Sequence, residues 1–299
     1  MTQHVVLTGG TGFIGQALCR QLQQRGDEVT VFSRRSTEEV HNLCGPVRHI
    51  DRLTTIPGLG PIDGIINLAG EGIAEKRWTR KRKQILWDSR VALTRVLVEE
   101  MKRCPHPPGA LISGSAVGYY GDQGERTVTE DTEPTDEFSH RMCAAWEEAA
   151  GEAAEISRLC ISRTGLVVGH GGGFLQQMLL PFRLGLGGRL GNGGQYMPWI
   201  HRLDMVNGLI FLLDSETLSG AFNLTAPNPV SNAEFTRILA SVLRRPAVLP
   251  APAPALRLAL GEMSRLLLTG QKAIPQRLQE AGFSFRYETL EPALREAVA

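Results

Sequence analysis

The chain has 299 residues, of which 42% are hydrophobic, and its 32 basic and 31 acidic side chains leave a formal net charge of +1. This composition is that of a globular protein and excludes disorder over the bulk of the chain. The near balance of charge also argues against a dedicated nucleic-acid binder, which carries a basic excess.

The first half of the chain predicts a parallel sheet covered by helices. Short apolar runs alternate with amphipathic stretches, and between the first two runs Ile14, Ala17, Leu18 and Leu22 recur on one face of a helix. Strands are expected at 5–8, 28–32, 47–50, 65–68, 110–113 and 159–163. Helices are expected at 13–25, 80–102 and 139–156. Strands that alternate with helices form βαβ units, so the fold class is α/β with a doubly wound sheet.

The second half differs in composition. Residues 165–194 hold 11 of the 33 glycines, interrupted by a short apolar helix expected at 174–182. Glycine at this density allows backbone conformations and close approaches that side chains forbid. A proline-rich stretch at 246–254 follows as a semi-rigid connector. We therefore expect a smaller, loop-rich domain after the doubly wound one.

Cysteine usage and the start of the chain predict a soluble, cytoplasmic protein. The 5 cysteines are widely spaced without a CxxC pair, which favours neither a disulfide framework nor a metal site. The N-terminus enters an apolar strand directly, without the features of a secretory signal. The longest apolar stretch is too short to span a bilayer, so no membrane partner is expected.

The strongest motif is a glycine loop between the first strand and the first helix. The stretch from Thr8 to Gly15 reads TGGTGFIG and contains both Gly10-x-Gly12-x-x-Gly15 and Gly9-x-x-Gly12-x-x-Gly15. Glycine lets the turn tighten and the helix pack close to the strand, and the free N–H groups at the helix start attract a pyrophosphate. A tight turn without a ligand is the alternative, and the strand-to-helix context favours a dinucleotide site.

The end of the second strand predicts which dinucleotide binds. It reads Ser33, Arg34, Arg35, and Arg34 lies 19 residues after Gly15. Sites that prefer NAD place an acidic residue about 20 residues beyond the glycines for the ribose 2′-hydroxyl, whereas an arginine suits a 2′-phosphate. A guanidinium can clamp that phosphate, and the serine hydroxyl can donate to it. The predicted cofactor is therefore NADP(H); two solvated loop arginines are the alternative.

Further motifs extend this pattern along the chain. They read INLAG at 66–70, LISGSA at 111–116, RTGLVVG at 163–169, LGLGGRLG at 184–191 and GQK at 270–272. With the glycine loop they resemble the extended short-chain dehydrogenase/reductase superfamily, and within it the YfcH-like branch of epimerase family proteins. The resemblance covers essentially the whole chain.

The resemblance implies a Rossmann-type NADP-binding domain over 1–167 and a smaller C-terminal substrate domain over 168–299, with about 199–226 returning to the first. A homodimer through the helices at 80–102 and 139–156 stays open, because the first of them begins with a basic run. Carried over by position, the cofactor-binding residues are Gly9, Thr11, Gly12, Phe13, Ile14, Gly15, Ser33, Arg34, Arg35, Leu68, Ala69, Gly70, Arg163, Thr164, Leu166 and Val167.

The catalytic pattern departs from that of the family. Relatives place a Ser or Thr after the fifth strand and a Tyr-x-x-x-Lys on the next helix, and Ser115 matches the first of these. With the helix aligned on Glu147, Ser139 stands where the Tyr belongs and Cys143 where the Lys belongs. The usual acid/base pair, a phenol whose pKa is lowered by a neighbouring cation, is therefore missing.

Two tyrosines are the substitutes we expect for the missing proton donor. Tyr119 and Tyr120 lie in a glycine-flanked loop at the carboxyl edge of the sheet, where open α/β sheets bind ligands, and Tyr120 is the first choice. Aromatic packing under the loop is an equal alternative. His140 titrates in the right range, yet its polar neighbours favour a solvated position.

A basic run, KRWTRKRK at 76–83, follows the INLAG motif. The resemblance directs its start toward the cleft, where cations can grip a carboxylate or phosphate and a tryptophan can stack on a ring. Nucleic-acid binding through this short run is the disfavoured alternative in a neutral chain. The predicted substrate-binding residues, two of them in the glycine-rich loop at 191–196, are Glu71, Lys76, Arg77, Trp78, Asn192 and Gln195.

Taken as a whole, the sequence predicts an NADP(H)-binding oxidoreductase or epimerase-like enzyme with a non-standard proton donor. Its substrate is expected to be small and polar, anionic or sugar-nucleotide-like. The alternative is a catalytically silent NADP(H) sensor that regulates a protein partner, which the missing Tyr and Lys motivate.

Overall fold

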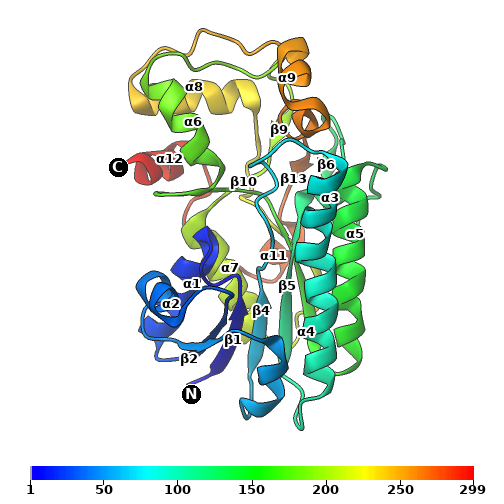
Figure 1. Ribbon diagram of the computed structural model, residues 1–299. Coiled ribbons are helices and arrows are strands. Elements are labelled where there is room, and N and C mark those ends of the chain that lie inside the picture. The colour runs from blue at the N-terminus through cyan, green and yellow to red at the C-terminus, as the bar shows by residue number, and fades with distance from the viewer. Residues whose placement is uncertain (1) are drawn as a thin grey trace.

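The apolar runs of the first half form six of the seven strands of a parallel sheet, and a strand from the second half forms one edge (Figure 1). The structure, a computed structural model, describes residues 2–299. Every position of the two central strands β1 and β4 is buried, because helices cover both faces of the sheet. In spatial order the strands are β11 (Gly220–Leu224), β7 (Arg158–Thr164), β5 (Ala110–Ala116), β4 (Gly64–Asn67), β1 (His4–Thr8), β2 (Glu28–Phe32) and β3 (Arg48–Ile50).

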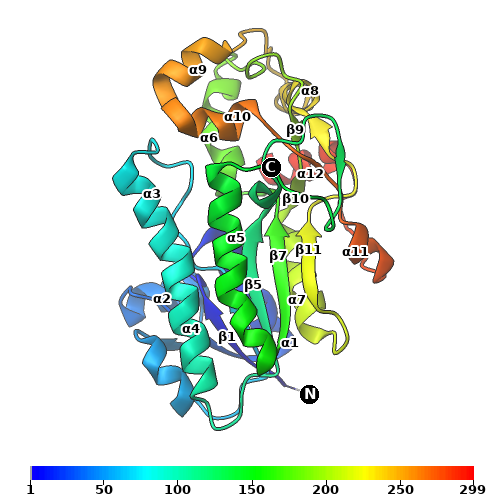
Figure 2. The ribbon, with the colours of Figure 1, turned by 90° about the vertical axis from the view of Figure 1, so that its right-hand side faces the viewer.

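Helices cover the two faces of this sheet (Figures 1 and 2). One face carries α1 (Phe13–Arg25), α2 (Thr37–Cys44) and α7 (Arg202–Asp214), and the other carries α3 (Arg80–Trp87), α4 (Leu93–Lys102) and α5 (Phe138–Gly151). The helix predicted over 80–102 contains a π-helical turn, η2 (Asp88–Ala92), and the one predicted over 139–156 ends in a 3-10 turn, η4 (Glu152–Glu155). The predicted fold class, a Rossmann-type doubly wound sheet, is confirmed.

Two apolar layers join the helices to the sheet. Leu7, Leu18 and Leu209 lie in the layer against α1 and α7, and Ile65 and Leu97 lie in the layer against α4; none is exposed to solvent. Burying one such side chain stabilises the fold by about 1.5–3 kcal/mol. These layers hold the strand ends, and the loops that follow them, in fixed positions.

The strand order reverses at the centre of the sheet. The chain runs from β1 outward through β2 and β3, and then returns to β4, on the other side of β1, before it runs outward through β5 and β7. Ligands of open α/β sheets bind in the crevice outside the carboxyl ends of the strands at such a reversal. The loops after β1 and β4 therefore flank the position where a ligand is expected.

A smaller part of the molecule lies beyond the carboxyl ends of the strands (Figures 1 and 2). Trp199, Phe235 and Leu294 are fully buried in its core. The chain returns from this part to the large sheet through α7 and β11, and β11 pairs with β7. The predicted domain boundary between residues 167 and 168 stays a prediction. No helix among residues 2–299 has the length and apolar character needed to cross a membrane. The helices of the smaller part are α6 (Gly173–Arg183), α8 (Asn232–Leu243), α9 (Ala253–Leu260), α10 (Arg265–Leu268) and α12 (Leu290–Val298), whereas α11 (Gln276–Glu280) lies beside the edge strand β11 (Figure 2). Short strands pair as β8 (Leu166–Val168) with β10 (Trp199–His201), β9 (Tyr196–Met197) with β12 (Val230–Ser231), and β13 (Lys272–Ala273) with β6 (Thr127–Val128).

Candidate functional site: a dinucleotide crevice

The glycine loop between β1 and α1 forms a tight turn that requires glycine at two positions. Gly9 has a φ of 72°, and a Cβ atom there would lie 2.6 Å from the carbonyl carbon of Leu68. A Cβ atom on Gly15 would lie 2.2 Å from the carbonyl oxygen of Gly9. Gly12 stands at the N-cap of α1, is exposed, and has no side chain with which to cap the helix. The first N–H groups of α1 therefore face an open cradle suited to an anion.

A buried hydrogen-bond network fixes the carboxyl ends of β1 and β4 beneath this cradle. The Thr8 hydroxyl donates to Oδ1 of Asn67 (2.6 Å) and accepts from the backbone N–H of Ala69 (3.2 Å). Nδ2 of Asn67 donates to the Thr94 hydroxyl on α4 (2.9 Å). The segment of Leu68, Ala69 and Gly70 is thereby held beside the glycine loop. Asn67, the polar residue within INLAG, was not among the predicted site residues.

The two arginines after β2 have different partners. Thr8 pairs with Phe32 in the sheet, so the residues after β2 emerge beside the glycine loop. Arg35 forms an ion pair with Glu39 one turn into α2 (3.3 Å), and its N–H donates to the Ser33 hydroxyl (3.2 Å). Arg34 is exposed and forms no ion pair with any of residues 2–299. Arg34 is thus the cation available to a ligand at this end of the crevice.

The glycine-rich segment of the smaller part lies against the start of α1. A Cβ atom on Gly172 would lie 2.4 Å from Cδ2 of Phe13, and one on Gly173 would lie 3.0 Å from its Cε1. The Arg202 guanidinium lies 4.8 Å from the centre of the same ring and donates to the carbonyl oxygen of His170 (3.0 Å). Glycine is required here because the backbone must reach the Phe13 ring.

The α5 positions at which the family resemblance led us to expect Tyr and Lys are packed against a turn. Ser139 and Cys143 are buried on α5, facing the turn η3 (Val117–Tyr120) that follows β5. A Cβ atom on Gly118 of η3 would lie 3.2 Å from Cβ of Ser139 and 3.8 Å from Sγ of Cys143. Burial raises the pKa of the Cys143 thiol to about 12, so this thiol stays protonated at neutral pH. The turn η3 therefore packs closely against this face of α5.

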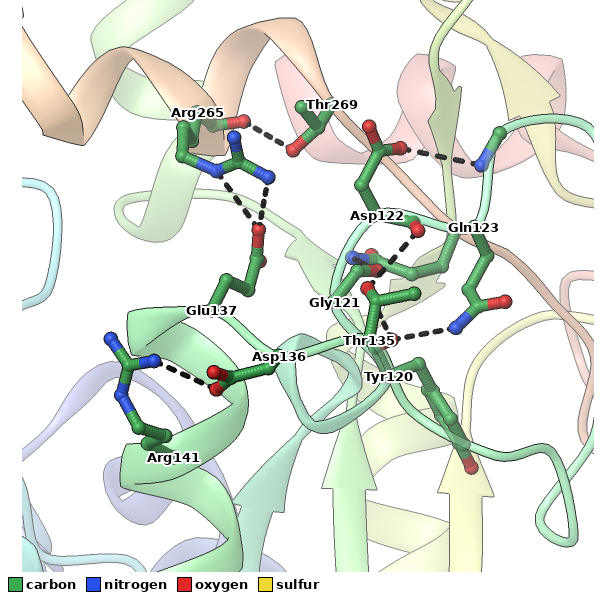
Figure 3. Close-up of polar contacts among 12 residues, drawn as sticks. Tyr120, Gly121, Asp122, Gln123, Thr135, Asp136, Glu137, Arg141, Arg265 and Thr269 are labelled. Carbon is green, nitrogen blue, oxygen red and sulfur yellow. Dashed lines mark hydrogen bonds and ion pairs between the residues drawn. The ribbon is translucent and has the colours of Figure 1, made fainter.

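Tyr120 is buried in the core, and this position disfavours its predicted role as proton donor. Its hydroxyl donates to Oδ1 of Asn223 (2.6 Å) and accepts from Nη1 of Arg163 (3.0 Å), and the side chain has no exposed surface. Burial raises the pKa of this phenol to about 12. Figure 3 shows the ring directed away from Thr135 and Gln123, which donate to the Tyr120 carbonyl oxygen. The alternative of aromatic packing under the loop fits this residue.

Tyr119 and His140 lie beside each other at the edge of this cluster. The Tyr119 ring is half-buried, lies on the Arg163 guanidinium (3.6 Å) and meets the His140 ring edge-on (5.3 Å). One ring nitrogen of His140 is hydrogen-bonded to the Tyr119 carbonyl oxygen (2.6 Å). The Tyr119 hydroxyl has no hydrogen-bond partner among residues 2–299. Of the two tyrosines, Tyr119 is therefore the one whose hydroxyl is free.

Arg163, a predicted cofactor residue, instead joins a buried ion pair. Its Nε and Nη2 donate to the two oxygens of Glu147 (3.0 and 2.9 Å), and Nη1 donates to Tyr120 and to the Glu130 carbonyl oxygen. The exposed fractions of the two side chains are 6% and 14%. Ser115, the predicted catalytic serine, donates to the same Glu147 carboxylate (2.6 Å). The Arg163 guanidinium is therefore directed into this network, and the predicted contact of residues 163–167 with the ribose and nicotinamide of the cofactor stays a prediction.

The carboxyl group of Glu130, whose carbonyl oxygen belongs to this network, makes the free energy of unfolding depend on pH. Its Oε1 accepts from the Asn223 N–H, while its Oε2 is buried without a partner among the described residues, and burial raises the pKa of the group. An acid whose pKa is raised by folding contributes stability below its unfolded pKa, about 4.3, and loses it as the pH rises through the folded pKa. Glu130→Gln is therefore expected to raise the free energy of unfolding at pH 8, with a gain that shrinks toward pH 4.5. Urea unfolding at both pH values measures this; a gain independent of pH would contradict it.

The predicted substrate residues fall into two separate groups. Trp78 is 7% exposed, donates from Nε1 to the Ile73 carbonyl oxygen (2.9 Å) and packs edge-on against Phe138 (5.0 Å), so it is not free to stack on a substrate. Glu71 is paired with Arg82, while Lys76 and Arg77 are exposed, the latter near Gly261. In the smaller part, Oδ1 of Asn192 accepts a hydrogen bond from the backbone N–H of Gly194. Nε2 of Gln195 donates to the carbonyl oxygens of Leu190 and Leu267.

A shallow polar pocket lies where the C-terminal segment meets the start of α5. Its cations are paired with carboxylates: Arg265 with Glu137 (Nε to Oε2, 2.9 Å) and Arg141 with Asp136 (2.7 Å), as Figure 3 shows. Ser139, at the position of the missing Tyr, lines its floor. The lining residues are Trp78, Asp136, Glu137, Phe138, Ser139, Arg141, Glu262 and Arg265.

Comparison with known proteins identifies the family models and the relatives that this chain matches. A model of the NAD dependent epimerase/dehydratase family matches residues 5–225, and a model of a domain of unknown function, DUF1731, matches residues 251–297. The bovine epimerase family protein SDR39U1 is 38% identical over 301 residues, covering 99% of each chain. The solved structure of human SDR39U1 (isoform 2) with NADPH has a TM-score of 0.90 at 34% identity and covers 98% of both chains. A nucleoside-diphosphate sugar epimerase from Corynebacterium glutamicum has a TM-score of 0.81 at 29% identity, covering all of this chain and 58% of its own.

Proposed function

This chain belongs to the NAD dependent epimerase/dehydratase family, and we propose that it binds NADP(H) in the crevice at the strand reversal. The observation that carries the proposal is the glycine cradle at the start of α1 together with Arg34 at the end of the neighbouring strand. The cradle supplies N–H donors for a diphosphate, and the guanidinium supplies charge for a 2′-phosphate. The human relative solved with NADPH supports the same cofactor for this chain.

The residues present fit this cofactor. Gly9, Gly12 and Gly15 would hold the diphosphate, Arg34 with Ser33 would bind the phosphorylated adenosine ribose, and the segment of Leu68, Ala69 and Gly70 would line the nicotinamide half. When bound, the nicotinamide supplies hydride exchange with a carbonyl or alcohol carbon. The protein's part is to bind and orient, and to hold a proton near the reacting oxygen.

We propose an oxidoreductase or epimerase-like reaction on a small polar substrate. The Corynebacterium relative supports a nucleotide-sugar-like substrate class. Because Tyr120 is buried and bonded, Tyr119 is the side chain we favour as proton donor, and Ser115 on β5 stays the second predicted catalytic residue. A panel of carbonyl compounds and nucleotide sugars, followed by NADPH absorbance and by product epimerisation, tests this proposal. Loss of turnover in Tyr119→Phe but not in His140→Gln would support the assignment.

The packing of η3 on α5 favours a second candidate function. Because η3 packs on Ser139 and Cys143, neither of which is a phenol or an ammonium group, the crevice can retain cofactor binding without the usual acid/base chemistry. A catalytically silent NADP(H) sensor that regulates a protein partner fits that arrangement. Tight NADPH binding with no turnover on the panel, and a partner captured with NADPH but not with NADP⁺, would favour this candidate over the enzyme.

The two arginines after β2 allow a test of the 2′-phosphate site. Arg34→Ala is expected to weaken NADPH binding by about 10–100-fold, since a hydrogen bond to a charged group contributes roughly 1.5–3 kcal/mol. Arg35→Ala is expected to have a smaller effect, because Arg35 is already paired with Glu39. NADH binding should change little in either variant. Isothermal titration of each variant with both cofactors measures this; an equal loss for NADPH and NADH in Arg34→Ala would remove the 2′-phosphate assignment.

A further inference from the structure

A π-helical turn interrupts the long helix beside the crevice. Residues Asp88–Ala92 form this turn, η2, between α3 and α4. Isolated π turns are uncommon and occur frequently at functional sites, because they redirect one side chain out of the regular helical register. Arg90 belongs to this turn; its Nη1 donates to the Leu86 carbonyl oxygen (3.2 Å) and its Nη2 donates to the Glu71 carbonyl oxygen (2.9 Å).

These contacts lay the Arg90 guanidinium on the segment that follows β4. A Cβ atom on Gly70 would lie 3.0 Å from Cζ of Arg90 and 3.3 Å from its Nε, so the group lies directly on the glycine backbone. The other side of the guanidinium approaches the Trp146 ring of α5 at 5.3 Å from its centre. A side chain at position 70 would make the guanidinium shift by a few tenths of an ångström.

Arg90 also lies close to the position of the missing Lys. Trp146 follows Cys143 by one helical turn on α5, so the guanidinium reaches the helix surface that carries both. The charge of Arg90 opposes the effect of burial on the pKa of Cys143. A cation from the neighbouring helix thus lies against the surface of α5 that carries Trp146 and Cys143.

The Arg90 guanidinium has N–H donors that no group of the described residues accepts from and that are available to a ligand. An arginine has five N–H donors. Three hydrogen bonds from Arg90 reach Leu86, Glu71 and the Ser89 hydroxyl (3.3 Å), and none is made by Nε to any of residues 2–299. A dinucleotide crosses the sheet at the strand reversal, so with its adenosine half at β2 its other half lies over β4 and β5. Gly70 and Arg90 stand at the end of β4.

We propose that Arg90 binds the nicotinamide half of the cofactor, at the ribose hydroxyls, and replaces the missing Lys of α5 in this role. The proposal rests on NADP(H) binding as proposed above. It assigns a binding residue to a helix that supplies none of the predicted cofactor contacts, and it gives the π turn a role. The adenosine half is expected to bind without Arg90.

Two ligands separate the halves of the site: NADPH, and adenosine 2′,5′-bisphosphate, which lacks the nicotinamide half. Arg90→Met is expected to weaken NADPH binding about tenfold and to leave binding of the bisphosphate within about twofold of the unmodified protein. Arg90→Lys, which keeps the charge, is expected to bind NADPH more tightly than Arg90→Met. Arg95→Met, an exposed arginine of the adjoining α4, is the matched control and should bind both ligands normally.

Isothermal titration gives the dissociation constants, and near-UV circular dichroism verifies that each variant is folded. Unchanged NADPH binding in Arg90→Met would overturn the proposal, as would an equal loss for both ligands, which would indicate a collapsed loop. Equal affinities of the Lys and Met variants would also overturn it, because the charge would then have no role. Failure of the unmodified protein to bind either ligand would instead refute the proposed function.

Discussion

Replacing Gly15 with alanine is expected to abolish NADP(H) binding and to lower the free energy of unfolding by about 1–3 kcal/mol. The new Cβ atom would lie 2.2 Å from the Gly9 carbonyl oxygen and 2.6 Å from Cα of Gly10, both backbone atoms of the loop itself. The helix could accept the methyl group only by moving away from β1, which would open the cradle. Titration with NADPH and urea unfolding measure the two effects.

Gly151→Ala provides the matched control for this substitution. Gly151 ends α5, and a Cβ atom there would meet no atom within 4 Å. Alanine is favoured over glycine in helices by up to about 1 kcal/mol, so this variant should be at least as stable as the unmodified protein and bind NADPH normally. Normal cofactor affinity in Gly15→Ala would show that the cradle does not have the geometry described.

Breaking the buried ion pair of Arg163 is expected to have the largest effect on stability. Arg163→Met removes the partner of Glu147 and leaves a carboxylate with 14% exposure that accepts a hydrogen bond from the Ser115 hydroxyl. Loss of one member of a buried pair costs about 3–5 kcal/mol, because the other charge remains desolvated. Urea unfolding near neutral pH is the appropriate measurement.

A double-mutant cycle separates the ion pair from other effects. Glu147→Leu together with Arg163→Met removes both charges, so the double variant is expected to be more stable than the sum of the single losses predicts. The ion pair Arg295–Glu291, whose side chains are 59% and 52% exposed, is the control, and its loss should cost no more than about 1 kcal/mol. Additive losses at Glu147 and Arg163 would contradict a direct interaction.

The architecture was predictable because local sequence and tertiary structure agree. The apolar runs become the strands, and α1 occupies the predicted residues 13–25, ending at Gly26, whose φ is 89°. The glycine loop was predictable for the same reason: Gly9 and Gly15 are constrained by atoms of their own loop and of the adjoining strand end, and the motif encodes that constraint.

The remaining details depend on contacts between residues far apart in the chain. Burial of Tyr120 is set by Asn223 and Arg163, and burial of Trp78 by Phe138 and the C-terminal segment, so their packing could not be read from neighbouring residues. Arg90 was missed because it appears as an ordinary polar position in an amphipathic helix. The π turn that contains it has no simple sequence pattern.

The measurement that tests the central claim most directly is a titration of the unmodified protein with NADPH and with NADH under identical conditions. An exposed Arg34 beside the glycine cradle, with no carboxylate at the end of β2, predicts that NADPH binds at least about tenfold more tightly, a difference of roughly 1.4 kcal/mol. Equal affinity for the two cofactors, or no binding of either, would contradict it.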